Sequence, residues 1–224
     1  GINHARDIGG SGVFGDTAAV RHTLQAAWSD APSLYISPYG DSDDRTRRIG
    51  GRYQADLERG RAGFSAGLEI THEQADNTYV TGTLFQPVPV SRVVAGLFGE
   101  SRWDIGERGA VTAGARLERI ERHTLEANPS LYSPRPAFEP DVVWSLNPKV
   151  SAAWFLRGTR SADAATGWTK IRGGAGTGIK PPTVFEIAYT DNPSLKPERS
   201  RSMDVGIEHA FPGVLLVADA TYFF

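Results

Sequence analysis

The chain has 224 residues and a formal net charge of −2, from 24 basic and 26 acidic residues, so its charge gives no sign of a nucleic-acid partner. It has no cysteine, which excludes disulfides, thiolate metal sites and a cysteine nucleophile. The longest aliphatic run, residues 214–218, is far shorter than the roughly 18 apolar residues of a membrane-spanning helix. Abundant glycine and strand-forming residues are typical of a soluble β protein or of a barrel with alternating strands.

Apolar and polar residues alternate along most of the chain, which is the pattern of half-buried strands. In residues 61–74, for example, Phe64 and Leu68 fall on one face, and Ser65 and Glu69 fall on the other. The pattern predicts nine strands, at residues 18–28, 45–58, 61–74, 90–103, 110–122, 142–156, 167–177, 200–210 and 214–224.

The expected connections alternate in length, and the strands are long. Short or medium connections, at 59–60, 104–109, 157–166 and 211–213, are predicted at one end of the strands, and long ones, at 29–44, 75–89, 123–141 and 178–199, at the other. Soluble sheets have strands of about five or six residues. A strand of about 11 residues tilted near 40° rises about 28 Å, enough to cross the hydrocarbon layer of a bilayer.

The position of the charges decides which face meets lipid. Charged residues such as Arg48, Arg52, Glu69 and Arg116 share one parity, and an arginine or lysine facing lipid at mid-depth costs roughly 2–4 kcal/mol. We therefore expect the apolar parity to face lipid and the charged parity to face a wet lumen. The exceptions are Arg119, His22, His72 and His209, which face outward, and Phe98 and Phe155, which face inward without an evident partner.

Aromatic residues gather near the predicted strand ends, as in the interfacial girdles of membrane barrels. Trp103 and Trp154 come just before short connections, Trp168 and Phe211 lie near others, and Trp28 lies at the long-loop end. The alternative is that these rings belong to the core of a soluble β-sandwich.

Residues 173–182, GGAGTGIKPP, have the glycines of a phosphate-binding loop but not its spacing. Lys180 comes one place late, no hydroxyl residue follows it, and Pro181 and Pro182 stand where the helix would begin. The two prolines instead remove amide donors where a strand leaves its ladder.

The last 52 residues carry a series of motifs in a fixed order. A strand ending in G-x-G-x-K-x-P is followed by N-P-x-L-K-P-E, a strand of the type S-x-x-x-E-x-G-x-E, in which Asp204 replaces the first glutamate, and T-Y-F. Upstream, residues 114–118 match G-x-R-x-E, and residues 147–149 match x-P-K. This order resembles the barrel of TonB-dependent outer-membrane receptors. The matching residues are Gly176, Gly178, Lys180, Pro182, Asn192, Pro193, Leu195, Lys196, Pro197, Glu198, Gly206, Glu208, Thr221, Tyr222 and Phe223.

The resemblance implies an all-β, antiparallel up-and-down transmembrane β-barrel in the outer membrane of a Gram-negative cell. It implies uptake of a scarce solute, most often a ferric siderophore, powered by the TonB complex through a plug domain. Barrels of this family have about 22 strands. The nine predicted strands, without a plug domain, indicate that residues 1–224 are part of one barrel domain. The motif residues are expected to shape loops and the rim, and the four long connections are expected to carry ligand specificity.

Two other classes stay open at this point: a passive porin-type barrel, and a soluble β-sandwich binding module. An enzyme is not expected, since no nucleophile setting is recognisable and the Asp43-Asp44 pair falls in a predicted loop. No catalytic residue, cofactor or metal site is predicted. The five histidines, His4, His22, His72, His123 and His209, are far apart in the sequence and at different expected depths.

Overall fold

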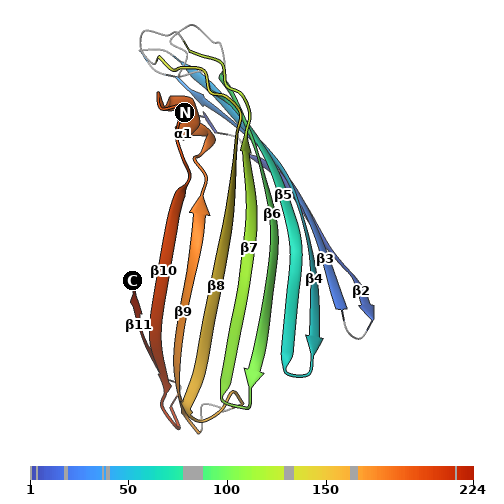
Figure 1. Cartoon of the computed structure of the whole chain (residues 1–224), viewed down its shortest axis with the longest axis vertical. Coiled ribbons are helices and arrows are strands. Elements are labelled where there is room, and N and C mark those ends of the chain that lie inside the picture. The colour runs from blue at the N-terminus through green and yellow to red at the C-terminus, as the bar shows by residue number, and fades with distance from the viewer. Residues whose placement is uncertain are drawn as a thin grey trace.

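The computed structural model describes residues 2–3, 5–17, 20–36, 38, 41–77, 88–128, 134–161, 166–214 and 216–224. These residues form a single curved antiparallel sheet (Figure 1). Its strands are β1 (Ile2–Asn3), β2 (Arg6–Thr17), β3 (Val20–Tyr35), β4 (Ser42–Arg59), β5 (Ala62–Asn77), β6 (Val88–Ile105), β7 (Gly109–Arg122), β8 (Asp141–Arg157), β9 (Trp168–Lys180), β10 (Glu198–Ala210) and β11 (Val217–Phe223), and it has one helix, α1 (Val184–Tyr189). Within the described part of the chain, no helix has the length and apolar character needed to cross a bilayer.

The strands form an up-and-down meander. From β3 to β11 each strand pairs with the next one in the sequence, and β1 and β2 both pair with β3. The register aligns apolar side chains across the sheet, so that Tyr53, Leu68, Leu97 and Leu117 follow one another on β4 to β7. The fold is therefore the predicted all-β, up-and-down barrel architecture, with two N-terminal strands more than the nine expected.

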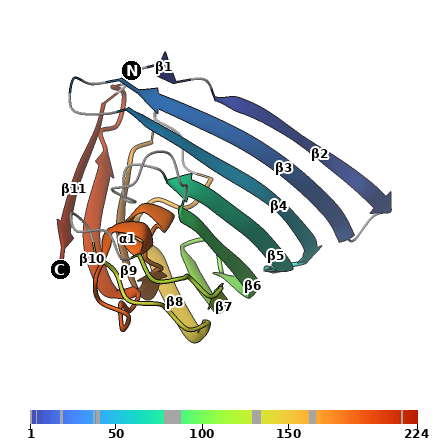
Figure 2. The same cartoon turned by 90° about the horizontal axis from the view of Figure 1, so that it is seen from above.

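The two faces of the sheet differ in polarity as predicted. Leu68, Leu97 and Met203 lie on the convex outer face, and their side chains are 52%, 60% and 57% exposed. The charged parity lines the concave face, which curves around α1 (Figure 2). Because no second sheet covers the apolar face among the described residues, the structure contradicts the β-sandwich.

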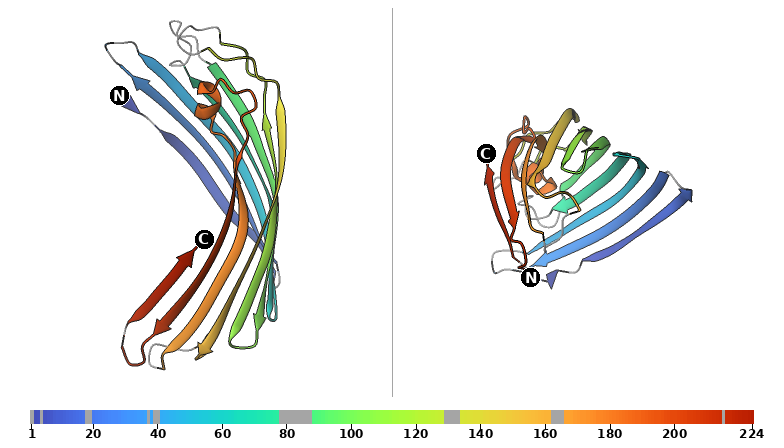
Figure 3. Two further views of the ribbon diagram at one scale, coloured as in Figure 1. Left: turned by 60° about the vertical axis from the view of Figure 1, so that its left-hand side comes forward. Right: turned by 90° about the horizontal axis from the view of Figure 1, so that it is seen from below.

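The packed core lies at one end of the concave face, called here the loop end, which carries α1 and the long connections. It joins β5, β6, α1 and the arm, defined here as residues 123–128 and 134–140, and residues from each of them are nearly inaccessible to solvent. Its members are Ala75, Val88, Val90, Leu125, Phe138, Val184, Ile187 and Ala188. The other end of the sheet, with shorter connections, is called the turn end (Figure 3).

The N-terminal region differs most from the sequence prediction. Strand β2 was not predicted, because glycines in residues 6–17 interrupt the alternation, but its backbone pairs with β3 from Arg6↔Asp30 to Thr17↔Val20. The predicted long connection at 29–44 is also wrong. Strand β3 continues to Tyr35 and strand β4 begins at Ser42, so that only residues 36–41 connect them. Charges on both faces hid this continuation, whereas the backbone ladder does not depend on side-chain polarity.

The remaining connections were partly predicted. The segment at 178–199 contains α1, which the sequence analysis did not predict, and the last strand begins at Val217 instead of residue 214. Residues 78–87 and 129–133, within the predicted connections 75–89 and 123–141, lie outside the described residues.

The structure supplies partners for the two phenylalanines that face inward. The Arg52 guanidinium lies 4.6 Å from the ring centroid of Phe98. Phe155 meets Trp168 edge to face, with ring centroids 5.7 Å apart. Both rings are therefore covered by neighbours on the concave face, although charged residues predominate there.

Each outward histidine has a hydroxyl partner on a neighbouring strand. His22 Nδ1 lies 2.7 Å from Tyr53 Oη. His72 Nε2 lies 2.9 Å from Ser91 Oγ, and His209 Nδ1 lies 2.8 Å from Thr169 Oγ1. These hydrogen bonds reduce the cost of placing imidazoles on the outer face.

Candidate functional site

Residues 181–197, between β9 and β10, fold over the concave face at the loop end. Pro181 and Pro182 end the β9 ladder, and Thr183 begins α1 with a capping box. Thr183 Oγ1 accepts a hydrogen bond from the Glu186 amide at 3.1 Å, and Glu186 Oε2 accepts one from the Thr183 amide at 2.6 Å. The hydrogen bonds from the Thr183 amide and hydroxyl lower the pKa of Glu186 below its ordinary value.

The apolar face of α1 holds the helix against the sheet. Ile187 and Ala188 are 2% and 0% exposed, and they belong to the core that includes Ala75 on β5 and Val90 on β6. A six-residue helix is unstable alone, so this packing determines that the segment is helical and where it lies.

An ion-pair group on the sheet anchors the start of the same segment. Glu73 on β5 is buried and pairs with both Arg48 on β4, at 2.8 Å, and Arg92 on β6. Arg92 Nη1 also donates to the carbonyl oxygen of Pro182. Because Arg92 contacts both Glu73 and Pro182, the two strands hold the segment inward.

The arm holds the end of α1. Arg135 is 4% exposed, and its Nη1 donates to the carbonyl oxygen of Ala188 at 3.2 Å. Its Nη2 donates to the Glu126 carbonyl at 2.5 Å, and its guanidinium lies 5.8 Å from the Phe138 ring centroid. Burial lowers the pKa of Arg135. The arm and the helix therefore form one packed cover over the loop end.

Below this cover, charged side chains form a network across the concave face. Arg116 lies 3.4 Å from Glu69 and 2.9 Å from Glu118, and Arg52 lies 3.9 Å from Glu69. Asn147 Nδ2 donates to Glu118 at 3.0 Å. The network borders a groove of about 510 Å³ that continues to β9. A polar solute on this face meets charges of both signs at fixed positions.

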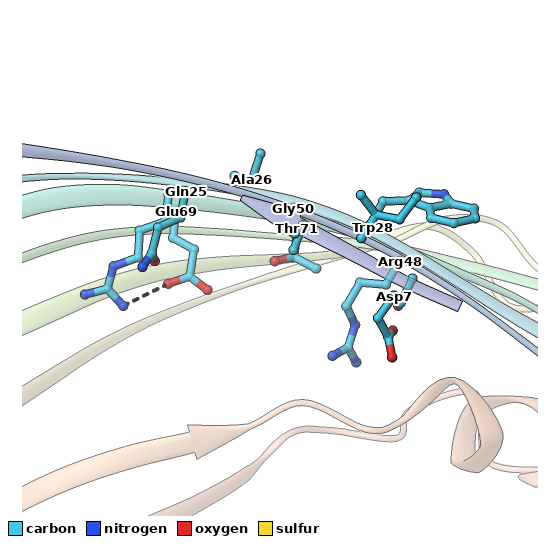
Figure 4. Close-up of a pocket in the computed structure, with 14 residues that line it drawn as sticks. Asp7, Gln25, Ala26, Trp28, Arg48, Gly50, Glu69 and Thr71 are labelled. Carbon is cyan, nitrogen blue, oxygen red and sulfur yellow. Dashed lines mark ion pairs between the residues drawn. The ribbon is translucent and has the colours of Figure 1, made fainter. Parts of the chain in front are cut away.

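A second groove, of about 480 Å³, lies under β2 to β5. Asp7, Arg48, Glu69 and Thr71 project from the sheet on the concave side, whereas Trp28 lies on the opposite face (Figure 4). Since Asp7 comes from β2, part of this groove depends on the strand that the sequence analysis did not predict.

The sheet splits between β8 and β9 at the loop end. Their described residues pair only from Lys149↔Gly176 to Arg157↔Thr169, and Pro148, just above, has no amide hydrogen to continue the ladder. Arg199 on β10 crosses this split, with Nη1 3.1 Å from Ser145 Oγ and Nη2 3.4 Å from the Trp144 carbonyl oxygen. We call this feature the β8–β9 split.

The structure brings several motif residues together. Lys180, Pro182, Leu195, Lys196 and Glu198 border a pocket of about 400 Å³ with Phe185, Glu186 and Thr190 from the α1 segment. Phe185 has no role that the sequence pattern predicts, and only the helical fold brings it to the pocket.

The other motif residues lie along the backbone of the loop and the strands. Asn192 Oδ1 accepts from the Ser194 amide at 2.9 Å, which shapes the turn around Pro193. Pro197 comes just before β10. Gly176 and Gly178 lie on the concave parity of β9, Gly206 lies on β10 opposite Arg172, and Glu208 pairs with Lys170 at 2.7 Å and Arg172 at 2.8 Å.

The five histidines were expected to lie at different depths, but two of them lie at the same depth. The rings of His72 and His123 lie side by side, with centroids 6.4 Å apart. No group of three or more histidine, aspartate or glutamate side chains with the geometry of a metal site occurs among the described residues.

Comparison with known proteins agrees with this architecture. No curated protein sequence matches the chain. The solved structure of the copper transporter OprC superposes with a TM-score of 0.75 at 19% identity, over 99% of this chain and 37% of that one, so this chain spans well under two thirds of the transporter. The translocator domain of the autotransporter NalP from Neisseria meningitidis gives a TM-score of 0.40 at 8% identity, over 99% of this chain and 80% of that one. This TM-score is too low to indicate a shared fold.

The sequence also matches a family model. The model for the TonB dependent receptor-like β-barrel matches residues 3–224, nearly the whole chain. Members of this family are transporters of the Gram-negative outer membrane, not enzymes, in agreement with the expectation that this chain is not an enzyme. The chain belongs to the TonB dependent receptor-like β-barrel family.

Proposed function

We propose that this chain is part of an outer-membrane receptor barrel that captures a scarce solute at the loop end and takes it up with energy from TonB. The observation that carries the proposal is the family match over residues 3–224, on a sheet with an apolar outer face and a charged concave face. The covered loop end supports capture, because α1 and the arm narrow the opening above two grooves that are lined in part by charged side chains.

Further strands of the same receptor complete the barrel in this proposal. The chain spans 37% of the copper transporter, and β11 has no strand on its outer side among the described residues. An open edge has unpaired backbone groups, which a bilayer does not tolerate. A plug domain outside this chain closes the lumen and transmits the pull of TonB.

The proposed cargo is a preassembled metal complex, a ferric siderophore, and not a bare metal ion. One structural neighbour is a copper transporter, but soft copper(I) ions favour thiolate and thioether ligands. This chain has no cysteine, and its one methionine, Met203, faces outward. The 400 Å³ pocket combines Phe185 with two lysines and two glutamates, Lys180, Lys196, Glu186 and Glu198, which suits a ligand with an organic surface and polar groups.

The test is uptake by cells that carry the receptor as their only route. We expect accumulation of ⁵⁵Fe supplied as siderophore complexes, with no gain in ⁶⁴Cu uptake over the deletion strain. Copper uptake without siderophore uptake would reject the cargo. Removing TonB should stop uptake. Uptake that continues without TonB would instead identify a passive porin.

A further inference from the structure

Two arginines lie on the outer face of β10, above its apolar residues. Arg199 and Arg201 share the parity of Met203, Val205 and Ile207, whose side chains are exposed on that face. Both arginine residues are exposed as well. The outer face of β10 thus changes from apolar to basic within two residues.

The change occurs at the depth where a bilayer ends. Arg201 is nine residues from Ala210, the last residue of β10 at the turn end. At about 3.3 Å per residue and a tilt near 40°, it lies about 23 Å above the turn end. The apolar band of such barrels is about 25 Å tall. The Arg201 guanidinium is therefore at the level of lipid headgroups.

Two other outward arginines at the loop end have carboxylate partners. Arg45 pairs with Asp30 at 2.6 Å, and Arg119 pairs with Glu121 at 2.5 Å. The Arg201 side chain makes no ion pair or hydrogen bond with any residue that the structure describes. Its charge is therefore open to an anion from outside the protein.

The surroundings of Arg201 add positive charge and apolar surface. Arg199 donates to two uncharged oxygens, on Trp144 and Ser145, so its charge is not neutralised by a carboxylate there. The Trp144 ring is 57% exposed on the outer face. Exposed indoles are typical of the level between headgroups and acyl chains.

We propose that Arg199 and Arg201 bind the phosphate of a phosphorylated lipid in the outer leaflet, with its acyl chains on Met203 and Val205. Arginine suits phosphate because its planar guanidinium donates two parallel hydrogen bonds. The proposal rests on the membrane placement in the proposed function, but not on the cargo.

Binding is tested on the purified receptor in uncharged detergent by native mass spectrometry. The probes are lipid A and the same lipid A with its phosphates removed. We expect lipid A to bind to the wild type, and the dephosphorylated form to bind roughly tenfold more weakly, as expected for lost charge-assisted hydrogen bonds. Arg201→Gln should lower lipid A binding by a similar factor, and Arg201→Lys should restore most of it.

The matched control is Arg61→Gln. Arg61 is exposed at the turn end, far from Arg201 along the strands, so its substitution should leave lipid A binding unchanged. Equal binding of the two lipids, or equal lipid A binding by Arg201→Gln and Arg61→Gln, would overturn the proposal. Displacement of lipid A by inorganic phosphate at equal phosphorus concentration would reject a lipid source. Siderophore uptake should persist in Arg201→Gln, so that failure of the lipid site and failure of the transport function are separate results.

Discussion

The ring of Phe98 on β6 lies against Gly67 on β5, on the concave face of the sheet. A Cβ atom on Gly67 would stand 2.5 Å from Phe98 Cζ and 2.2 Å from the Tyr53 carbonyl oxygen. Phe98 thus occupies the space that a side chain at Gly67 would need, between β5 and the Arg52 guanidinium.

This contact predicts that Gly67→Ala weakens the sheet. The new methyl group meets backbone as well as the ring, so the strand itself must shift, and overpacking of this kind costs about 1–3 kcal/mol. Gly99→Ala is the matched control, because nothing lies within 4 Å of a Cβ there. Urea unfolding of the receptor refolded into vesicles measures both. Equal stability of the two variants would contradict the contact.

Glu73→Gln should loosen the cover over the loop end. The substitution leaves Arg92 and Arg48 without their shared buried carboxylate, and breaking a buried ion pair costs about 3–5 kcal/mol. We expect faster chymotrypsin cleavage after Phe185, which is exposed in the same segment, because Arg92 no longer holds Pro182 firmly.

Glu100→Gln is the control for this experiment. Glu100 pairs with Lys149, but both side chains are more exposed, at 36% and 63%, so its loss should cost less than about 1 kcal/mol. A cleavage rate for Glu73→Gln no higher than that of this control would show that the ion pairs do not anchor the segment.

The capping box of α1 should make the helix sensitive to acid. The folded-state pKa of Glu186 is lowered, so its contribution is complete above the ordinary value of 4.5 and is lost as the pH falls through the folded pKa. The protection of the α1 amides against hydrogen exchange, measured relative to the intrinsic rate at each pH, should therefore fall in that acidic range. In Glu186→Gln this protection should be lower at neutral pH and nearly insensitive to the titration.

Thr183→Ala removes the other half of the capping box. Loss of an N-cap side chain typically costs about 1 kcal/mol. Exchange of the α1 amides should be faster than in the wild type at every pH from 4 to 7, a range chosen to span the ordinary Glu186 pKa of 4.5. Unchanged exchange in Thr183→Ala would mean that packing alone holds the helix.

Arg199→Gln should widen the β8–β9 split. The glutamine side chain is shorter and loses the two donors that reach Ser145 and Trp144, and Pro148 prevents the backbone ladder from replacing them. Amide exchange in residues 142–147 should increase, while exchange in the paired residues 149–157 stays the same. An equal increase in both segments would indicate general unfolding.

The free-energy cost of adding a charged side chain should depend on which face of the sheet receives it. Ala115→Arg places a guanidinium on the apolar face, about six residues from the turn end of β7, and should cost roughly 2–4 kcal/mol in a bilayer. Thr112→Arg, on the concave face of the same strand, should cost much less. The comparison is made by folding both into vesicles, and equal costs would contradict the assignment of the faces.

The sequence determined the long strands, their order from β3 onward, and which face is apolar. Alternation of side chains is a property of each strand alone, because neighbouring residues point to opposite faces, and the cost of charge in lipid then orients the sheet. It also placed most of the motif residues at strand ends and in the loop after β9.

The tertiary structure alone decided the features that depend on partners distant in the sequence. Strand β2 exists because β3 pairs with its backbone, although its glycines carry no side-chain pattern. Helix α1 is too short to form alone, and it is held by Val90, Glu73 with Arg92, and Arg135 from three other segments. The single sequence contains no record of these contacts, because each is created only when the chain brings its strands and arm together in space.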